Sequence, residues 1–171
     1  MERTLTEVKI RRQHVASATG GEPVVYCEAL IATTTCAPEF IDITDDVARV
    51  VADSGTWSGQ VTVFSGHTTA AIKVNEHEPL LLGDMARILA EIAPAHGEYD
   101  HNDFSRRTVN LDEDECANGH AHCQHLFLST SETIPIIDGQ LALGTWQRVF
   151  LVELDRPRDR KVLVNVVGVK K

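Results

Sequence analysis

The sequence has 171 residues, of which 43% are hydrophobic and 24% are charged. This length can bury one hydrophobic core and is short for two ordinary domains, so we expect a single domain over residues 1–171. The net charge of −9 argues against general binding to nucleic acid, which requires a basic surface. An anionic ligand would therefore need a local basic patch or a metal ion.

The cellular setting follows from the termini and the cysteines. The first residues show no signal-peptide pattern, and no apolar run approaches a membrane-spanning length, so no membrane partner is expected. The four cysteines contain no C-x-x-C pair: Cys27, Cys36, Cys116 and Cys123. We expect a cytoplasmic protein whose cysteines are small buried side chains and not disulfides. The spacing of Cys116 and Cys123 leaves open a thiolate ligand to zinc.

The N-terminal part predicts strands followed by a helix. Residues 4–12, "TLTEVKIRR", alternate apolar and polar side chains, and residues 23–34 form a more apolar, β-branched run. The intervening "ATGGEP" predicts a turn. Residues 42–55, "DITDDVARVVADSG", predict a helix with Thr44 as N-cap and Gly55 as its end. We expect this helix to lie on a sheet.

The middle of the chain contains two further strands and the longest predicted helix. The runs 60–64 and 68–74 are separated only by "SGH", which is short enough for them to pair or to form one bent ribbon. Residues 79–92 have helical apolar periodicity and end before Pro94. Residues 95–118 are polar and aperiodic, and a connection of that length is usually functional or disordered.

From residue 123 onward, short β-rich runs alternate with turns and predict an antiparallel meander. Strands, two helices and strands again do not follow a regular βαβ alternation. The sequence therefore predicts one compact α+β domain with a mixed or antiparallel sheet and two main helices. We expect the helices to cover one face of the sheet.

Three histidines crowd the segment "NGHAHCQH": His120, His122 and His125. If the segment is extended, His120 and His122 project from the same face, because side chains repeat every two residues along a strand. Two imidazoles on one face can begin a divalent-metal site. Solvent-exposed or hydrogen-bonded histidines are the alternative interpretation.

Other polar residues occur where reactive groups are commonly positioned. His67, Asn75 and Glu76 lie at predicted strand ends, and His101 lies in the long loop. Structural explanations stay open for them. Asn75 and Glu76 could neutralise the N-terminus of the following helix, and Asp84 on that helix could be a solvated surface acid.

A basic and aromatic stretch begins at the last predicted turns. Trp146 offers an aromatic plane, and Gln147 offers an amide donor and acceptor. Arg156, Arg158 and Arg160 concentrate positive charge, and guanidinium groups pair bidentately with phosphate oxygens. These arginines form the strongest candidate anion patch, with a charged hairpin turn as the alternative.

Together, "HTTAAIKVNEHEP", "NGHAH", "DGQLALGTWQ" and "VELDRPRDRKVLVNVVG" closely resemble the YjbQ family, also called the secondary thiamine-phosphate synthase family. The resemblance covers about residues 40–168; residues 1–39 are a strand region with an extra segment around 18–36. The resemblance implies a compact α+β fold and a homotrimer with polar sites near the subunit boundaries. It also implies thiamine-phosphate synthase activity, which joins hydroxymethylpyrimidine diphosphate to a thiazole phosphate and releases pyrophosphate.

Carried over by position, the resemblance implies a set of site residues. We expect catalytic groups at Glu76, Asp84, His101 and His122, with His101 and His122 as ligands of a divalent metal ion, zinc or magnesium. The expected substrate-binding residues are His67, Thr68, Asn75, Trp146, Gln147, Arg158 and Arg160. The family usually has Leu and Lys where this chain has Cys123 and Gln124, so a cation that could bind phosphate is missing.

Three functions are compatible with these residues. The first is the synthase, in which a divalent cation and arginines stabilise the departing diphosphate. The second is a metal-dependent hydrolase of a phosphorylated metabolite, with His101 or His122 as proton carrier. The third is a non-catalytic trimeric binding protein. The expected partners are a small phosphorylated metabolite and other copies of the chain.

Overall fold

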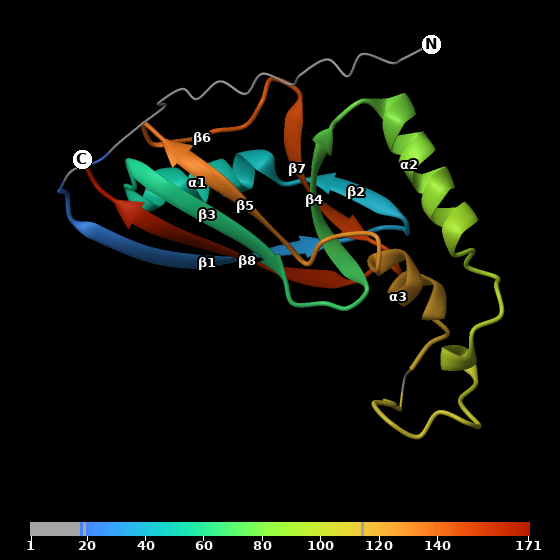
Figure 1. The fold of residues 1–171 in the computed structure, drawn as a ribbon. Coiled ribbons are helices and arrows are strands. Elements are labelled where there is room, and N and C mark those ends of the chain that lie inside the picture. Colours follow the sequence, from blue (N-terminus) through green and yellow to red (C-terminus); the bar gives the residue numbers. More distant parts are fainter. Residues whose placement is uncertain (1–17, 19, 114) are drawn as a thin grey trace, which may run out of the picture.

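Two antiparallel sheets organise the part of the chain that the structure, a computed structural model, describes: residues 18, 20–113 and 115–171 (Figure 1). The predicted strand 4–12 lies outside the described residues. The strands are β1 Pro23–Thr33, β2 Glu39–Asp42, β3 Ser58–Ser65, β4 Ala70–Glu76, β5 Ser131–Ile137, β6 Gln140–Leu141, β7 Gln147–Glu153 and β8 Asp159–Val169. The helices are α1 Thr44–Ser54, α2 Pro79–Ile92, the 3-10 turn η1 Asp100–Asn102 and α3 Gly119–His125.

The strand order excludes one of two alternatives that the sequence left open and corrects one sequence prediction. One sheet has the order β1-β8-β3-β5-β6 and the other β2-β7-β4, and every pair is antiparallel. The adjacent runs β3 and β4 therefore do not pair, because the short link between them carries the chain from one sheet to the other. The C-terminal strands are not a meander. Along the chain β7 follows β6 and precedes β8, but it belongs to the smaller sheet, whereas β6 and β8 belong to the larger one. The predicted α+β class is confirmed.

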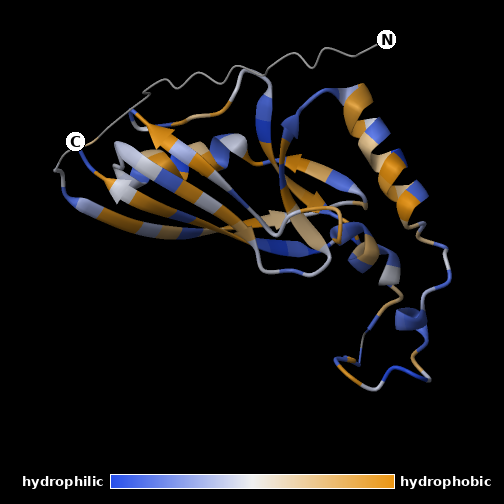
Figure 2. Ribbon diagram, viewed as in Figure 1, coloured by the Kyte–Doolittle hydropathy of each residue, from blue (hydrophilic) through white to orange (hydrophobic). Residues whose placement is uncertain are grey.

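The main core lies between the two sheets and α1. Val47, Val50 and Val51 of α1 pack with buried valines, isoleucines and leucines of both sheets. Figure 2 shows hydrophobic residues alternating with hydrophilic ones along the strands. Gly55 ends α1 in a left-handed conformation, as predicted. Thr44 is not the N-cap: its hydroxyl accepts a hydrogen bond from the Val149 N–H at 2.7 Å and thereby ties α1 to β7.

A second cluster covers the other face of the smaller sheet. Leu89 of α2 and Ala121 of α3 pack there with Phe150, Val152 and Leu154. Leu89 is the only α2 residue that is fully buried, and α2 stands at the outer side of the domain (Figure 1). The expectation that the helices cover one sheet face is therefore wrong, because α1 and α2 lie on opposite faces of the smaller sheet.

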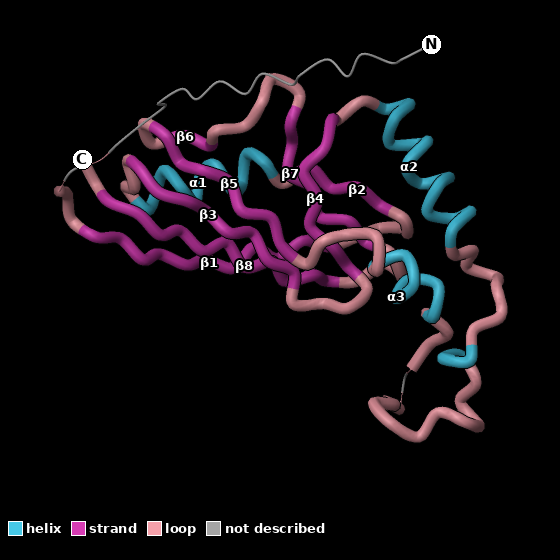
Figure 3. The backbone as a smooth tube through the Cα atoms, viewed as in Figure 1, coloured by secondary structure: helices cyan, strands magenta, loops and turns pink. Residues whose placement is uncertain are grey.

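The histidine-rich segment is helical and not extended. Residues 119–125 form α3, which follows a long loop that projects from the domain (Figure 3). His122 and His125, three residues apart, therefore lie on the same side of the helix, and the predicted pairing of His120 with His122 is wrong.

The cysteines and helices bear on the expected cellular setting. All four cysteines are free, but Cys27 and Cys36 are exposed, which corrects the expectation that they are buried. Within the described residues, no helix combines the length and apolar character needed to cross a bilayer. The cytoplasmic location stays a prediction.

Candidate functional site

Several polar segments meet at one end of the two sheets. The strand register places Ser65 opposite Val162 and Ala70 opposite Glu153. The link between β3 and β4 and the link between β7 and β8 therefore lie side by side. The turn η1 and helix α3 approach the same end, so residues that are distant in sequence become neighbours.

The link 66–69, which carries His67, Thr68 and Thr69, is held by hydrogen bonds. The Ser65 hydroxyl donates to the Ala70 carbonyl at 2.8 Å, and Arg160 donates to the Thr69 hydroxyl at 3.0 Å. His67 Nε2 accepts the Lys161 N–H at 3.0 Å, so its neutral ring carries the proton on Nδ1. Burial, followed by the nearby charge of Arg160, lowers the pKa of His67. This ring is therefore a neutral donor near neutral pH.

A buried ion pair between Arg160 and Glu153 lies next to the link 66–69 and supports it. Arg160 Nε donates to the Glu153 carboxylate at 2.6 Å, and the two side chains are only 2% and 0% exposed. Burial raises the pKa of Glu153, but hydrogen bonds from Arg160 and the backbone outweigh it and lower the pKa. The charge of Arg160 is thus already compensated. Arg160 positions Thr69 and is not a free cation for a ligand.

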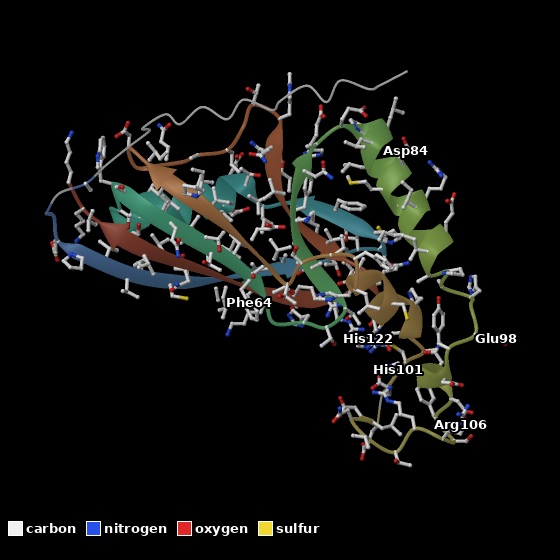
Figure 4. The ribbon with its side chains drawn as sticks, in the orientation of Figure 1. Phe64, Asp84, Glu98, His101, Arg106 and His122 are labelled. Atoms are coloured by element: carbon white, nitrogen blue, oxygen red, sulfur yellow. The ribbon has the colours of Figure 1, made fainter. Side chains whose placement is uncertain are left out.

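His101 and His122 lie edge to face, with ring centroids 4.7 Å apart (Figure 4). The Gly119 N–H donates to the Asn102 side-chain oxygen at 2.9 Å and fixes η1 against α3. A Cβ at residue 119 would lie only 2.6 Å from the Tyr99 Cβ, so glycine is required for this close approach. Burial, followed by the neighbouring His101, lowers the pKa of His122.

These segments enclose a cavity of about 420 Å³, which we call the anion cavity. Its cationic lining comes from Arg107, Arg158 and Arg160, and its other lining residues are residues 66–69, His101, Asn110, Glu115, Asn118 and His122. Arg107 donates to Glu115 at 3.1 Å, and Arg158 pairs with Asp155. The cavity therefore combines partly compensated arginines with the imidazoles of His67, His101 and His122.

Several buried polar atoms of the lining residues have no hydrogen-bond partner in the part of the chain that the structure describes. They are His101 Nε2, Arg107 Nη1, Asn118 Oδ1 and Arg158 Nε. An unpaired buried polar atom is costly, and the four residues that carry these atoms line the same cavity. Three of the four atoms are nitrogens that can act as hydrogen-bond donors.

The remaining predicted residues lie elsewhere. Glu76 and Trp146 line a separate cavity of about 290 Å³ at the opposite end of β4, about 20 Å away along the strand. Asp84 is exposed on α2 and pairs with Arg87 at 3.1 Å, far from His101 in Figure 4. Within one chain, neither Glu76 nor Asp84 lies near His101 and His122.

Asn75 and Gln147 make local contacts at that far end. Asn75 Oδ1 accepts the Glu76 N–H at 2.9 Å, and Gln147 Oε1 accepts the Gly144 N–H at 2.8 Å. Both side chains therefore stabilise the ends of β4 and β7. They do not reach the anion cavity.

The described side chains do not complete a metal site within one chain. No group of three His, Cys, Asp or Glu residues with suitable proximity occurs among residues 20–113 and 115–171. His101 and His122 would supply two ligands, whereas protein zinc sites use at least three. Burial and Asp155 raise the pKa of Cys116, which opposes the thiolate that zinc would need. The zinc or magnesium ion stays a prediction.

Gln124 has a structural role in this chain. Its amide donates to the Ala93 carbonyl at 2.9 Å and to the Leu89 carbonyl at 3.3 Å, at the C-terminal end of α2. The side chain is buried and does not line the anion cavity. Residue 124 does not line the anion cavity, so the presence of Gln and not Lys at this position leaves the cationic lining of the cavity unchanged.

The low imidazole pKa values predict a pH-dependent stability. Burial lowers the pKa of His67, His122 and His125 below the ordinary value of about 6.5. Below that value the unfolded chain binds protons that the folded chain does not, so the free energy of unfolding decreases as the pH falls. We expect the melting temperature to fall from about pH 7 to about pH 5, and less steeply in His125→Gln. Glu153 affects stability only nearer its own ordinary value of about 4.3, so a melting temperature constant over this range would contradict the assignment.

The fold and the cavity define the class: a small α+β protein with an arginine- and histidine-lined cavity at one end of two antiparallel sheets. The family model for YjbQ, described as "UPF0047 protein YjbQ-like", matches residues 28–169. The chain belongs to the YjbQ family, which confirms the resemblance seen in the sequence. The match begins within β1 and so includes part of the segment around 18–36.

Relatives in sequence and in structure agree with this family. A UPF0047 protein of Methanothermobacter thermautotrophicus is 38% identical over 144 residues, which cover 84% of this chain and 93% of the relative. The crystal structure of a YbjQ-like protein of unknown function from Sulfolobus solfataricus has a TM-score of 0.77 and 35% identity, covering 86% of this chain and 99% of that one. A YjbQ/UPF0047 family protein from Clostridium acetobutylicum has a TM-score of 0.71 and 36% identity, covering 81% and 98%.

Proposed function

We propose that the anion cavity binds the phosphate groups of a small phosphorylated metabolite. The clustering around one cavity of residues with unpaired, buried nitrogens carries this proposal, because Arg107 Nη1 and Arg158 Nε are donors that find no acceptor among the described residues. Guanidinium donors pair strongly with phosphate oxygens. In a protein of net charge −9, such donors mark a local site for anions.

We propose further that the reaction is that of a thiamine-phosphate synthase. The bond between the pyrimidine methylene and the diphosphate oxygen breaks, the bond from that methylene to the thiazole nitrogen forms, and pyrophosphate leaves with the electron pair. Arg107 and Arg158 would stabilise the charge that develops on the departing diphosphate. Neutral His67 can donate its Nδ1 proton to a phosphate oxygen. No step in this scheme depends on a redox reaction.

Hydrolysis of a phosphorylated metabolite is the second candidate. The low pKa of His122 favours it, because a neutral imidazole beside the cavity can accept a proton from water. Release of inorganic phosphate from a single phosphate ester, without an acceptor, would distinguish hydrolysis from synthesis.

The test is a synthase assay on the purified full chain. With both substrates and a divalent cation, we expect thiamine phosphate and pyrophosphate in equal amounts. Arg158→Gln should lower kcat about a hundredfold, because a donor to the developing charge is lost. Arg156→Gln removes the same charge from the same link but does not line the cavity, so it should stay near wild-type activity. Absence of product with the two substrates and a divalent cation would contradict the proposal. An equal loss of activity in the two variants would also contradict it.

We also propose that the chain assembles as a homotrimer. The support is exposed apolar surface: Leu80, Ile88 and Ile92 on α2, and Val25 and Ile31 on the outer face of β1, are 46–80% exposed. Patches of this kind mark interaction sites. Light scattering should give the mass of three chains, and Ile88→Glu with Ile92→Glu should reduce it if α2 lies in the interface.

A further inference from the structure

A second cavity of about 450 Å³ adjoins the anion cavity, and we call it the apolar annex. Residues 66–68 and His122 line both cavities, so the two lie next to each other. The annex alone is lined by Phe64, Leu126 and Thr130, together with Ser65 and His125. Phe64 lies at the end of β3, close to the link, as Figure 4 shows.

The chemistry of the two cavities differs sharply. The anion cavity has three arginines, whereas none of the described residues that line the annex is Arg, Lys, Asp or Glu. Phe64 is 41% exposed and Leu126 is 80% exposed. Large apolar side chains exposed beside a charged cavity provide a surface against which an apolar group can be buried.

Two imidazoles lie at the junction. His67 Nε2 is occupied by the Lys161 N–H, so its Nδ1–H is the atom left to donate. His122, on α3, lines both cavities.

We infer that the ligand has two parts: a phosphate or diphosphate in the anion cavity and a compact aromatic group in the apolar annex. This inference rests on the proposed function and assigns the aromatic part of the substrate to a subsite beside the anion cavity. Sugar phosphates and inorganic phosphate fill only the anion cavity and leave Phe64 and Leu126 in water. Specificity comes from the annex. The phosphate contacts are the same for every phosphorylated ligand, whereas burial of an apolar group in the annex adds affinity only for ligands that carry such a group.

The experiment compares benzyl phosphate with methyl phosphate, which share the phosphate group and differ in the apolar group. NMR titration of the full chain should show benzyl phosphate binding about tenfold more tightly than methyl phosphate. Phe64→Ser should abolish this preference while changing methyl phosphate affinity less than about twofold. Leu126→Ser provides a second annex variant if Phe64→Ser does not fold. Phe127→Ser, an exposed residue outside both cavities, is the matched control and should keep the preference.

The outcomes separate the two proposals. Equal affinity for both ligands, weakened by Arg158→Gln, would overturn the annex and leave the anion cavity standing. A preference that survives both annex variants would overturn the annex as its source. Absence of binding by either ligand would overturn the annex and the proposed function together.

Discussion

Glu153→Gln is expected to lower the free energy of unfolding by about 3–5 kcal/mol, because it leaves the Arg160 guanidinium buried without its counter-charge. Both side chains are almost completely inaccessible to water, so solvent cannot replace the lost partner. Chemical denaturation of the single variant, monitored by circular dichroism, measures the loss.

The double variant Glu153→Gln with Arg160→Met is the control. Removing both charges with little change in volume should recover most of the lost stability, because no buried charge is then left without its partner. The double variant should nonetheless bind pyrophosphate more weakly, since Arg160 no longer holds Thr69. A single variant within about 1 kcal/mol of wild type would show that the pair is not needed for the fold.

If the homotrimer that we propose brings Glu76 of one copy to His122 of the next, His122→Ala and Glu76→Gln should each be inactive alone, and mixing them should restore activity. Within one chain these residues occupy cavities at opposite ends of β4, so a site that uses both must join different subunits. If each site in a trimer pairs the histidine of one copy with the glutamate of the next, random mixing restores about one quarter of wild-type activity. The synthase assay, after subunit exchange in mild denaturant, measures this fraction.

The control mixes the single variant His122→Ala with a double variant that carries both His122→Ala and Glu76→Gln. No copy in that mixture carries His122, so it should stay inactive. If the mixture of single variants also stays inactive while native mass spectrometry shows mixed trimers, the two cavities do not form one site. Full activity of Glu76→Gln alone would remove Glu76 from the proposed site.

Sequence periodicity predicted the helices and strands better than it predicted which strands pair in the sheets. The 79–92 helix and the 60–64 strand appear as α2 and β3, because local apolar patterns define them. The separation of β3 and β4 into different sheets depends on contacts with β8 and β7, which no short window contains. The short helix α3 is stabilised by burial of Ala121 and by Gln124 contacts with α2, so its own residues gave no clear signal.

The candidate site was predicted in part. His67, His101, His122, Arg158 and Arg160 do line one cavity, although they come from four segments. The cavity residues Arg107, Asn110, Glu115 and Asn118 were missed individually. The only signal for them was the length of the loop 95–118, because aperiodic sequence does not show which side chains turn inward.

The requirement for glycine at residue 119 makes the spacing of His101 and His122 a property of the backbone. The two rings are neighbours only because no methyl group separates Tyr99 from the start of α3. A relative with alanine at the corresponding position would have to shift η1 outward or bend the helix start. Residue 119 is therefore a simple marker for relatives in which the two imidazoles can act on the same substrate.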